Sequence, residues 1–145
     1  MKTSMKTKLI ALGLLVILAL SLMACASAPK ETAVKVTTDE FQSQNNISQQ
    51  VEVPAGGVLT VTLGSNQTTG FQWSETASIT DTTVLKQTGH KYVAPDSGLA
   101  GAAGQEVWKF EALQKGTSTI TMAYSRPWEG GEKNEWTYTL TVTVK

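Results

Sequence analysis

Polar and apolar residues alternate with a period of two near the end of the chain. Between positions 136 and 144, large apolar residues occupy every second position and threonines fill the gaps. The apolar residues are Trp136, Tyr138, Leu140, Val142 and Val144, and the threonines are Thr137, Thr139, Thr141 and Thr143. A strand with one buried face has this pattern, and both residue types favour strands. The sequence therefore predicts a half-buried strand over 136–144.

The same alternation recurs in three other stretches, and no stretch has the apolar spacing of a helix. The alternating residues are Leu59, Val61 and Leu63; Trp108, Phe110 and Ala112; and Ile120, Met122 and Tyr124. Glycine- and proline-containing turns at 54–57, 64–70, 95–104, 115–116 and 127–131 separate the stretches. Short strands at this spacing predict one all-β domain over 34–145, an immunoglobulin-like antiparallel β-sandwich.

The first 24 residues have the pattern of a secretory signal. Lys2, Lys6 and Lys8 precede an uncharged apolar run over 9–23, which is too short for a comfortable membrane span. Ala24-Cys25 then resembles a bacterial lipobox, in which the cysteine is acylated and becomes the mature N-terminus. We expect a signal peptide over 1–24 and a lipid-anchored tether over 25–33, on a membrane of the bacterial cell envelope. The alternative is an ordinary signal peptide that leaves one unmodified thiol.

Charge and cysteine content exclude several classes of function. The chain has 12 basic and 12 acidic residues, and removal of Lys2, Lys6 and Lys8 leaves a mildly acidic remainder without a basic patch for nucleic acid. Cys25 is the only cysteine, so packing rather than a disulfide must hold the fold. The acidic residues Asp81, Asp96, Glu129, Glu132 and Glu135 lack EF-hand spacing. We expect neither a metal nor a cofactor.

Three connecting segments carry more than turn residues. In the first, Asn66 can form a side-chain turn, the β-branched Thr68 and Thr69 stiffen the tip, and Gly70 permits a positive φ. The second, 92–104, has three glycines and three alanines from Pro95 to Gly104, and such a bare backbone could pair with another chain. The alternatives are a solvated hairpin tip for the first segment and a flexible surface loop for the second.

The third segment contains Arg126, Pro127 and Trp128 in succession. Tryptophan and arginine are the residue types most enriched at interface hot spots. We therefore interpret this turn as a contact surface. The alternative is a tryptophan folded back on the edge of the sandwich, with Arg126 stacked on it.

Read in order, the three segments resemble those of the chagasin-type inhibitors of cysteine peptidases. The matching motifs are Asn66-Gln67-Thr68-Thr69-Gly70, Gly101-Ala102-Ala103-Gly104 (with Leu99 in the same segment) and Arg126-Pro127-Trp128. Two positions depart from the family pattern: Gln67 stands where proline is usual, and Ala103 stands where glycine is common. These departures bear on affinity and target preference.

The resemblance implies an immunoglobulin-like sandwich that presents three loops at one end to a papain-like cysteine peptidase. Thr68 would lie nearest the catalytic cysteine and histidine of the target. The segment around Gly101 would pair with backbone on the unprimed side of the cleft, and Arg126 and Trp128 would cover the primed side. Binding would be reversible and tight, and the inhibitor would be a monomer.

Two other functions remain open from the residues. An enzyme has little support, because His90 is the only histidine and no nucleophile-elbow pattern surrounds the nearby Ser97 and Asp96; we expect His90 at a strand end. A carbohydrate-binding or adhesion lipoprotein would use Trp73, Tyr92 and Trp128 as an aromatic platform.

Overall fold

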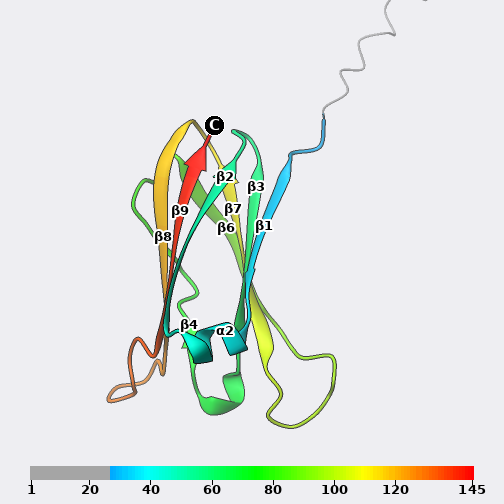
Figure 1. Ribbon diagram of the computed structural model, residues 1–145, viewed down its shortest axis with the longest axis vertical. Coiled ribbons are helices and arrows are strands. Elements are labelled where there is room, and N and C mark those ends of the chain that lie inside the picture. Colours follow the sequence, from blue (N-terminus) through cyan, green and yellow to red (C-terminus); the bar gives the residue numbers. More distant parts are fainter. Residues whose placement is uncertain (1–26) are drawn as a thin grey trace, which may run out of the picture.

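Two β-sheets pack face to face in the computed structural model, which describes residues 27–145 (Figure 1). The first sheet has the order β1-β3-β7-β6, and the second has the order β2-β9-β8-β4, with β5 paired to β8. The strands are β1 (Glu31–Val36), β2 (Asn46–Val53), β3 (Val58–Ser65), β4 (Gln72–Trp73), β5 (Ser78–Ile79), β6 (Leu85–Val93), β7 (Gly104–Ala112), β8 (Gly116–Ser125) and β9 (Trp136–Val144). The single-domain, all-β sandwich predicted from the sequence is confirmed.

The core lies between the two inner faces, and the alternating residues of the sequence supply it. Leu59, Val61 and Leu63 from β3 are fully buried against β8 and β9 residues such as Ile120 and Leu140. Burial alternates along most of β7, β8 and β9, as expected for strands with one covered face. It also alternates along β3 as far as Leu63, after which Gly64 and Ser65 are buried as well. Among residues 27–145, every buried side-chain nitrogen or oxygen has a hydrogen-bond partner.

The chain enters the sandwich earlier than the sequence indicated. β1 begins at Glu31 and runs parallel to β3, with Glu31 opposite Val58. Residues 31–33, expected in the tether, are therefore paired backbone. β2 runs parallel to β9, and the remaining strand pairs are antiparallel as predicted. The two parallel pairs arise because the chain changes sheets between β1 and β2, so neither strand forms a hairpin with its neighbour.

A short helix, α2 (Thr38–Ser43), makes this crossing and was not predicted. Thr37 and Glu40 form a capping box: the Thr37 side chain accepts from the Glu40 N–H, and the Glu40 carboxylate accepts from the Thr37 N–H at 2.7 Å. The Thr37 N–H and the Thr37 hydroxyl both donate to the Glu40 carboxylate, which holds the pKa of that carboxyl below its ordinary value. Six residues are too few to show a helical stripe, but Thr37-x-x-Glu40 is a capping signature that could have located the helix.

α2 contributes one large side chain to the core. Phe41 is fully buried, stacks on Trp136 with ring centroids 5.3 Å apart, and lies 4.9 Å from the ring of Trp73. Where α2 begins, a Cβ added to Gly64 would lie 2.4 Å from the Thr38 nitrogen, so only glycine allows this approach. The helix therefore fixes the crossing close to the end of β3.

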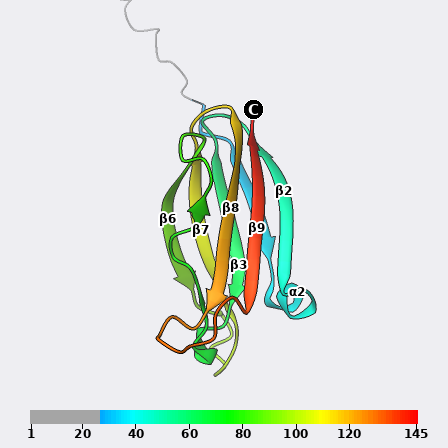
Figure 2. The same cartoon turned by 90° about the vertical axis from the view of Figure 1, so that its left-hand side faces the viewer.

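The two poles of the molecule differ in the length of the connections that they carry (Figures 1 and 2). The long connections β3–β4, β6–β7 and β8–β9 lie at the lower pole of Figure 1, and the described N-terminal end and the C-terminus lie at the upper one. An eight-residue strand such as β3 separates the poles by about 26 Å. Among residues 27–145, no helix has the length and apolar character that a membrane crossing requires.

We expect Phe41→Ala to destabilise the domain by about 3 kcal/mol, because it removes a buried aromatic ring and leaves a cavity under α2. The free energy of unfolding in urea measures this cost. Phe41→Leu is the matched control, since it keeps most of the apolar volume and should cost clearly less. Equal, small losses for both variants would mean that α2 is not anchored through this ring.

Candidate functional site

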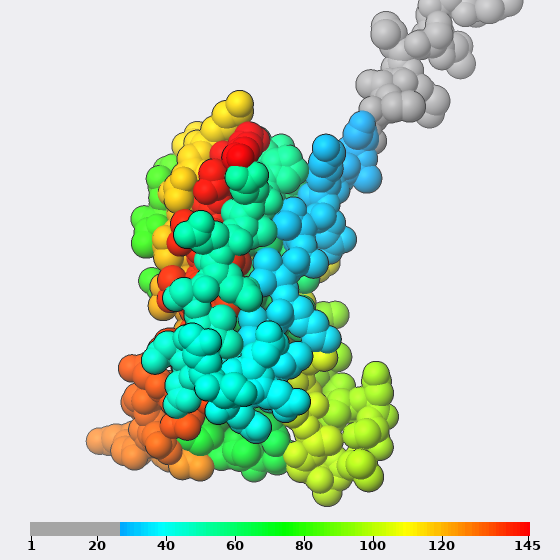
Figure 3. All heavy atoms as spheres, in the orientation of Figure 1, coloured from blue at the N-terminus to red at the C-terminus, as the bar shows by residue number. Residues whose placement is uncertain are grey.

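Three loops meet at one end of the sandwich, which we call the loop pole. They are the first loop (66–70), the second loop (94–103) and the third loop (126–135) (Figures 1 and 3). The strand register brings them together: Ser65 before the first loop pairs with Gly104 after the second, and Trp73 in β4 pairs with Tyr124 in β8. The structure thus places the three sequence motifs side by side.

The first loop holds its own shape through side chain–backbone bonds. Its 3₁₀ turn spans Gln67–Thr69, and the Asn66 side-chain oxygen accepts from the Thr68 N–H at 3.2 Å and the Thr68 hydroxyl at 2.6 Å. The Thr69 hydroxyl donates to the Asn66 carbonyl at 2.6 Å. Gly70 ends the turn with φ 81°, a left-handed conformation that favours glycine. Gln67, Thr68 and Thr69 are exposed on this braced turn.

The second loop is fastened to the first by one bond. The Asn66 side-chain amide donates to the Gly101 carbonyl at 3.0 Å, and Gly101 itself has φ 78°. The Ala102 N–H donates to the Leu99 carbonyl at 3.2 Å, and the Leu99 side chain is 71% exposed. Ala102 is half-buried and Ala103 is exposed. This loop therefore presents a bare backbone and one apolar side chain.

Gly104 does not belong to the second loop. It is the first residue of β7 and is buried beneath Tyr92. A Cβ at Gly104 would lie 2.4 Å from the Val93 carbonyl oxygen and 2.5 Å from the Tyr92 hydroxyl. Glycine is needed here for close packing, because no larger residue fits.

The third loop carries Trp128 across the first loop. The indole is 52% exposed, and a Cβ placed on Gly70 would lie 2.6 Å from its Cη2 atom, so the ring covers Gly70 closely. Pro127, next to it, is exposed. Gly70 is therefore constrained twice, by its positive φ and by the indole above it. Trp128 is neither buried in the sandwich nor free of it: one face packs on the first loop and the other meets solvent.

Arg126 turns back toward the first loop. Its guanidinium lies 4.4 Å from the centroid of the Phe71 ring, and its Nη2 donates to the Thr69 carbonyl at 3.3 Å. Nη1 forms an ion pair with Glu132 at 3.5 Å, and the Arg126 N–H donates to the Glu132 carbonyl at 2.8 Å. The alternative in which Arg126 stacks on Trp128 is not what the structure shows. Arg126 links the third loop to the first, which makes it a brace as well as a surface group.

Two residues that brace the loop pole were not assigned to it from the sequence. The Tyr124 hydroxyl, buried at the end of β8, accepts from the Asn66 N–H at 2.8 Å. The exposed Lys133 donates from Nζ to the carbonyls of Arg126 and Trp128, closing the third loop. Tyr124 was placed on a strand and fits the family pattern beside the loop motifs, but no bracing role was assigned to it from the sequence. The role of Lys133 could not be predicted from the sequence, because an isolated lysine in a polar loop belongs to no recognisable motif.

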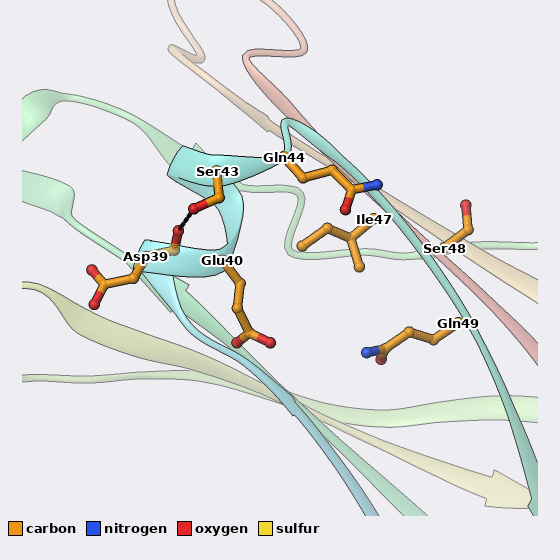
Figure 4. Close-up of a pocket in the computed structure, with 7 residues that line it drawn as sticks. All are labelled: Asp39, Glu40, Ser43, Gln44, Ile47, Ser48 and Gln49. Atoms are coloured by element: carbon orange, nitrogen blue, oxygen red, sulfur yellow. Dashed lines mark hydrogen bonds between the residues drawn. The ribbon is translucent and has the colours of Figure 1, made fainter.

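Several hollows flank this end of the molecule, and two of them adjoin α2. One, of about 300 Å³, lies behind the loops, and Thr38, Gln42, Asn66, Thr69, Ala103 and Arg126 are among the residues that line it. The other, of about 510 Å³, lies between α2 and β2 and is lined by Asp39, Glu40, Ser43, Gln44, Ile47, Ser48 and Gln49 (Figure 4). In the second hollow the Ser43 hydroxyl is bonded to the Asp39 carbonyl at 2.9 Å. Within 27–145, no three His, Asp or Glu side chains converge as a metal site.

The positions of His90 and Trp73 do not support the two alternative functions, an enzyme and a carbohydrate-binding module. His90 lies within β6, not at a strand end as expected, and pairs with the buried Glu106 at 2.8 Å instead of with Ser97. Trp73 is only 1% exposed, so it cannot join Tyr92 and Trp128 in a sugar-binding platform. Cys25 and the signal peptide lie outside the described residues.

A family model described as "Chagasin family peptidase inhibitor I42" matches residues 52–142. The chain belongs to the chagasin family of peptidase inhibitors. Chagasin of Trypanosoma cruzi is 33% identical over 94 residues, which cover 61% of this chain and 82% of chagasin. Amoebiasin-2 of Entamoeba histolytica (strain ATCC 30459 / HM-1:IMSS / ABRM) is 32% identical over 88 residues, or 61% of this chain and 71% of amoebiasin-2. A chagasin-family protein is an inhibitor of peptidases and not an enzyme.

Solved structures give the same fold. The cysteine protease inhibitor EhICP2 from Entamoeba histolytica aligns with a TM-score of 0.58 at 23% identity, covering 81% of this chain and all of that one. PbICP-C, solved in complex with falcipain-2, aligns with a TM-score of 0.57 at 18% identity, covering 80% of this chain and 99% of that one. At these sequence identities the structural similarity supports the β-sandwich fold alone. The chagasin-family assignment rests on the sequence match.

We expect Tyr124→Phe to loosen the first loop, because the Asn66 N–H loses its acceptor. An unpaired, partly buried N–H costs about 1 kcal/mol or more, and the Asn66 amide should exchange with solvent faster. Amide hydrogen exchange by NMR measures this. Tyr138→Phe is the control, since that buried hydroxyl bonds Gln49 on β2 and should leave Asn66 unchanged. Identical Asn66 exchange in both variants would contradict a bracing role for Tyr124.

Proposed function

We propose that this protein is a reversible, tight-binding inhibitor of papain-like cysteine peptidases that blocks the active-site cleft with its three loops. The observation that carries the proposal is the mutual bracing of the loops: Asn66 bonds Gly101 in the second loop, and Arg126 in the third bonds Thr69 in the first. Relatives add support for the target class, since EhICP2 is described as a cysteine protease inhibitor and PbICP-C was solved with falcipain-2.

Each loop has a role in this proposal. The turn of Gln67, Thr68 and Thr69 enters the centre of the cleft, with Thr68 nearest the catalytic pair of the peptidase. The second loop, with Leu99 and Gly101, pairs its backbone with the unprimed side. Trp128 packs on apolar surface of the primed side, and Arg126 supports it from below. The 3₁₀ turn offers no extended peptide for attack, so inhibition follows from occupancy and needs no covalent step.

Preorganisation makes such a surface tight. Loops that are already ordered lose little conformational entropy when they bind, so more of the contact energy appears as affinity. The bonds of Asn66, Arg126 and Lys133 order the three loops before a partner arrives. A standard interface of about 800 Å² per partner suits three loops of this size. We propose that the inhibitor acts as a monomer, since one copy carries all three loops.

We further propose that acylation of Cys25 anchors the protein to a membrane of the cell envelope. Support for a functional anchor comes from the position of β1, whose first residue lies at the pole opposite the loops (Figure 1). A tether attached there leaves the loop pole turned toward the aqueous phase. The targets would then be soluble peptidases that approach from outside the membrane.

We expect Trp128→Ala to weaken inhibition of papain by about 2 kcal/mol, or about 30-fold in the inhibition constant. The substitution removes a half-exposed indole that would be buried against the peptidase in the complex. A titration with the soluble fragment 26–145 measures this. Leu113→Ala is the control: it removes an exposed apolar side chain at the other pole and should leave the constant unchanged. Equal constants for the two variants would remove Trp128 from the contact surface.

We expect Cys25→Ser to shift the protein from the membrane fraction to the soluble fraction, because serine lacks the thiol that the lipid modification requires. The anchored wild type and the soluble variant should inhibit papain with the same constant, since the loops lie far from the tether. Membrane fractionation followed by papain titration tests both points. A variant that still sediments with membranes would show that something other than Cys25 holds the protein there.

A further inference from the structure

Glu106 is the one charged residue that is fully buried among residues 27–145. It lies in β7, two residues after the second loop joins the strand, and is 1% exposed. A carboxylate in a protein interior is costly unless hydrogen-bond donors surround it. Both carboxylate oxygens of Glu106 have hydrogen-bond partners in the structure.

One oxygen holds both ends of the first loop. Oε1 of Glu106 accepts from the Ser65 hydroxyl at 2.7 Å and from the Trp73 N–H at 3.1 Å. Ser65 is the residue directly before Asn66, and Trp73 is the third residue after Gly70. These two residues belong to β3 and β4, which lie in different sheets. The oxygen therefore sets the separation between the strand that enters the first loop and the strand that leaves it.

The other oxygen is held by the only histidine. Oε2 lies 2.8 Å from Nε2 of His90 on β6, and the imidazole ring is packed 4.8 Å from Trp108. The His90 side chain is 18% exposed, so it closes the network toward solvent. Glu106 thus joins β3, β4 and β6 at the base of the loop pole, where none of its atoms can reach a peptidase.

We propose that Glu106 is a positioning residue for inhibition: it fixes the base of the first loop so that the turn 67–69 keeps its binding geometry. The proposal rests on the proposed function, because its consequence is measured as inhibition of a peptidase. It differs from a contribution to core stability alone. A residue that only stabilises the core would change the unfolding free energy without changing the shape of the folded loop.

Two substitutions separate these roles. Glu106→Gln keeps an oxygen that accepts from Ser65 and Trp73, and its amide donates to His90 in the tautomer with an unprotonated Nε2. Glu106→Met has a similar length but no acceptor, so the Ser65 hydroxyl and the Trp73 N–H lose their partner. Glu111→Met, an exposed position on the same strand, is the matched control.

The experiment measures papain inhibition and amide hydrogen exchange on the same four proteins, the wild type included. We expect Glu106→Met to raise the inhibition constant by about tenfold or more, because the two donors are left without an acceptor. The amides of 66–73 should also exchange faster relative to those of β9. Glu106→Gln should stay within about threefold of the wild type, since its Oε1 acceptor is kept. Glu111→Met should match the wild type in both measurements.

Unchanged inhibition by a folded Glu106→Met protein would overturn the proposal, as would weaker inhibition without faster exchange in the first loop. If Glu106→Met does not fold, Ser65→Ala removes one of the two bonds to Oε1, and unchanged loop exchange in that variant would overturn it as well. Failure of the wild type to inhibit papain would instead count against the proposed function. Loop exchange would then still test whether Glu106 positions the loop.

Discussion

The hydrogen bonds of Asn66 connect the first loop to the second loop and to β8. Its side-chain oxygen accepts from Thr68, its side-chain amide donates to Gly101, and its backbone N–H donates to the Tyr124 hydroxyl. One residue therefore orders the first loop, ties the second loop to it, and fastens both to the strand that leads into the third. An amide side chain suits this position because it accepts and donates at once.

Beneath Asn66, the sandwich supplies a rigid base. Phe41, Trp73, Tyr124 and Trp136 form an aromatic cluster under the loops, with Tyr124 and Trp136 stacked at 4.5 Å. Above it, the Arg126 guanidinium stacks on Phe71 and the Trp128 indole covers Gly70. Packing at the base and polar bonds at the tips together hold the three loops in one arrangement within the free chain, as the proposed inhibition requires.

The sequence predicted those parts of the fold that follow from local periodicity. The alternation of Trp136 through Val144 located β9, and the glycine–proline turns located the loops. β2 was not predicted because Gln49 interrupts the apolar face that Ile47, Val51 and Val53 form. β6 was not predicted because it carries polar residues on both faces. α2 escaped because six residues are fewer than two helical turns. The family resemblance placed the loop motifs together, but the bonds from Tyr124, Lys133 and Glu106 depend on tertiary geometry that no local pattern encodes.

The claim that three braced loops form one contact surface is tested most directly by a hydrogen-exchange footprint. Fragment 26–145 would be compared free and saturated with catalytically inactivated papain. The account predicts protection at 66–70, 94–103 and 126–135, and none at the opposite pole around 54–57 and 113–116. Protection confined to one loop, or centred on the opposite pole, would contradict it.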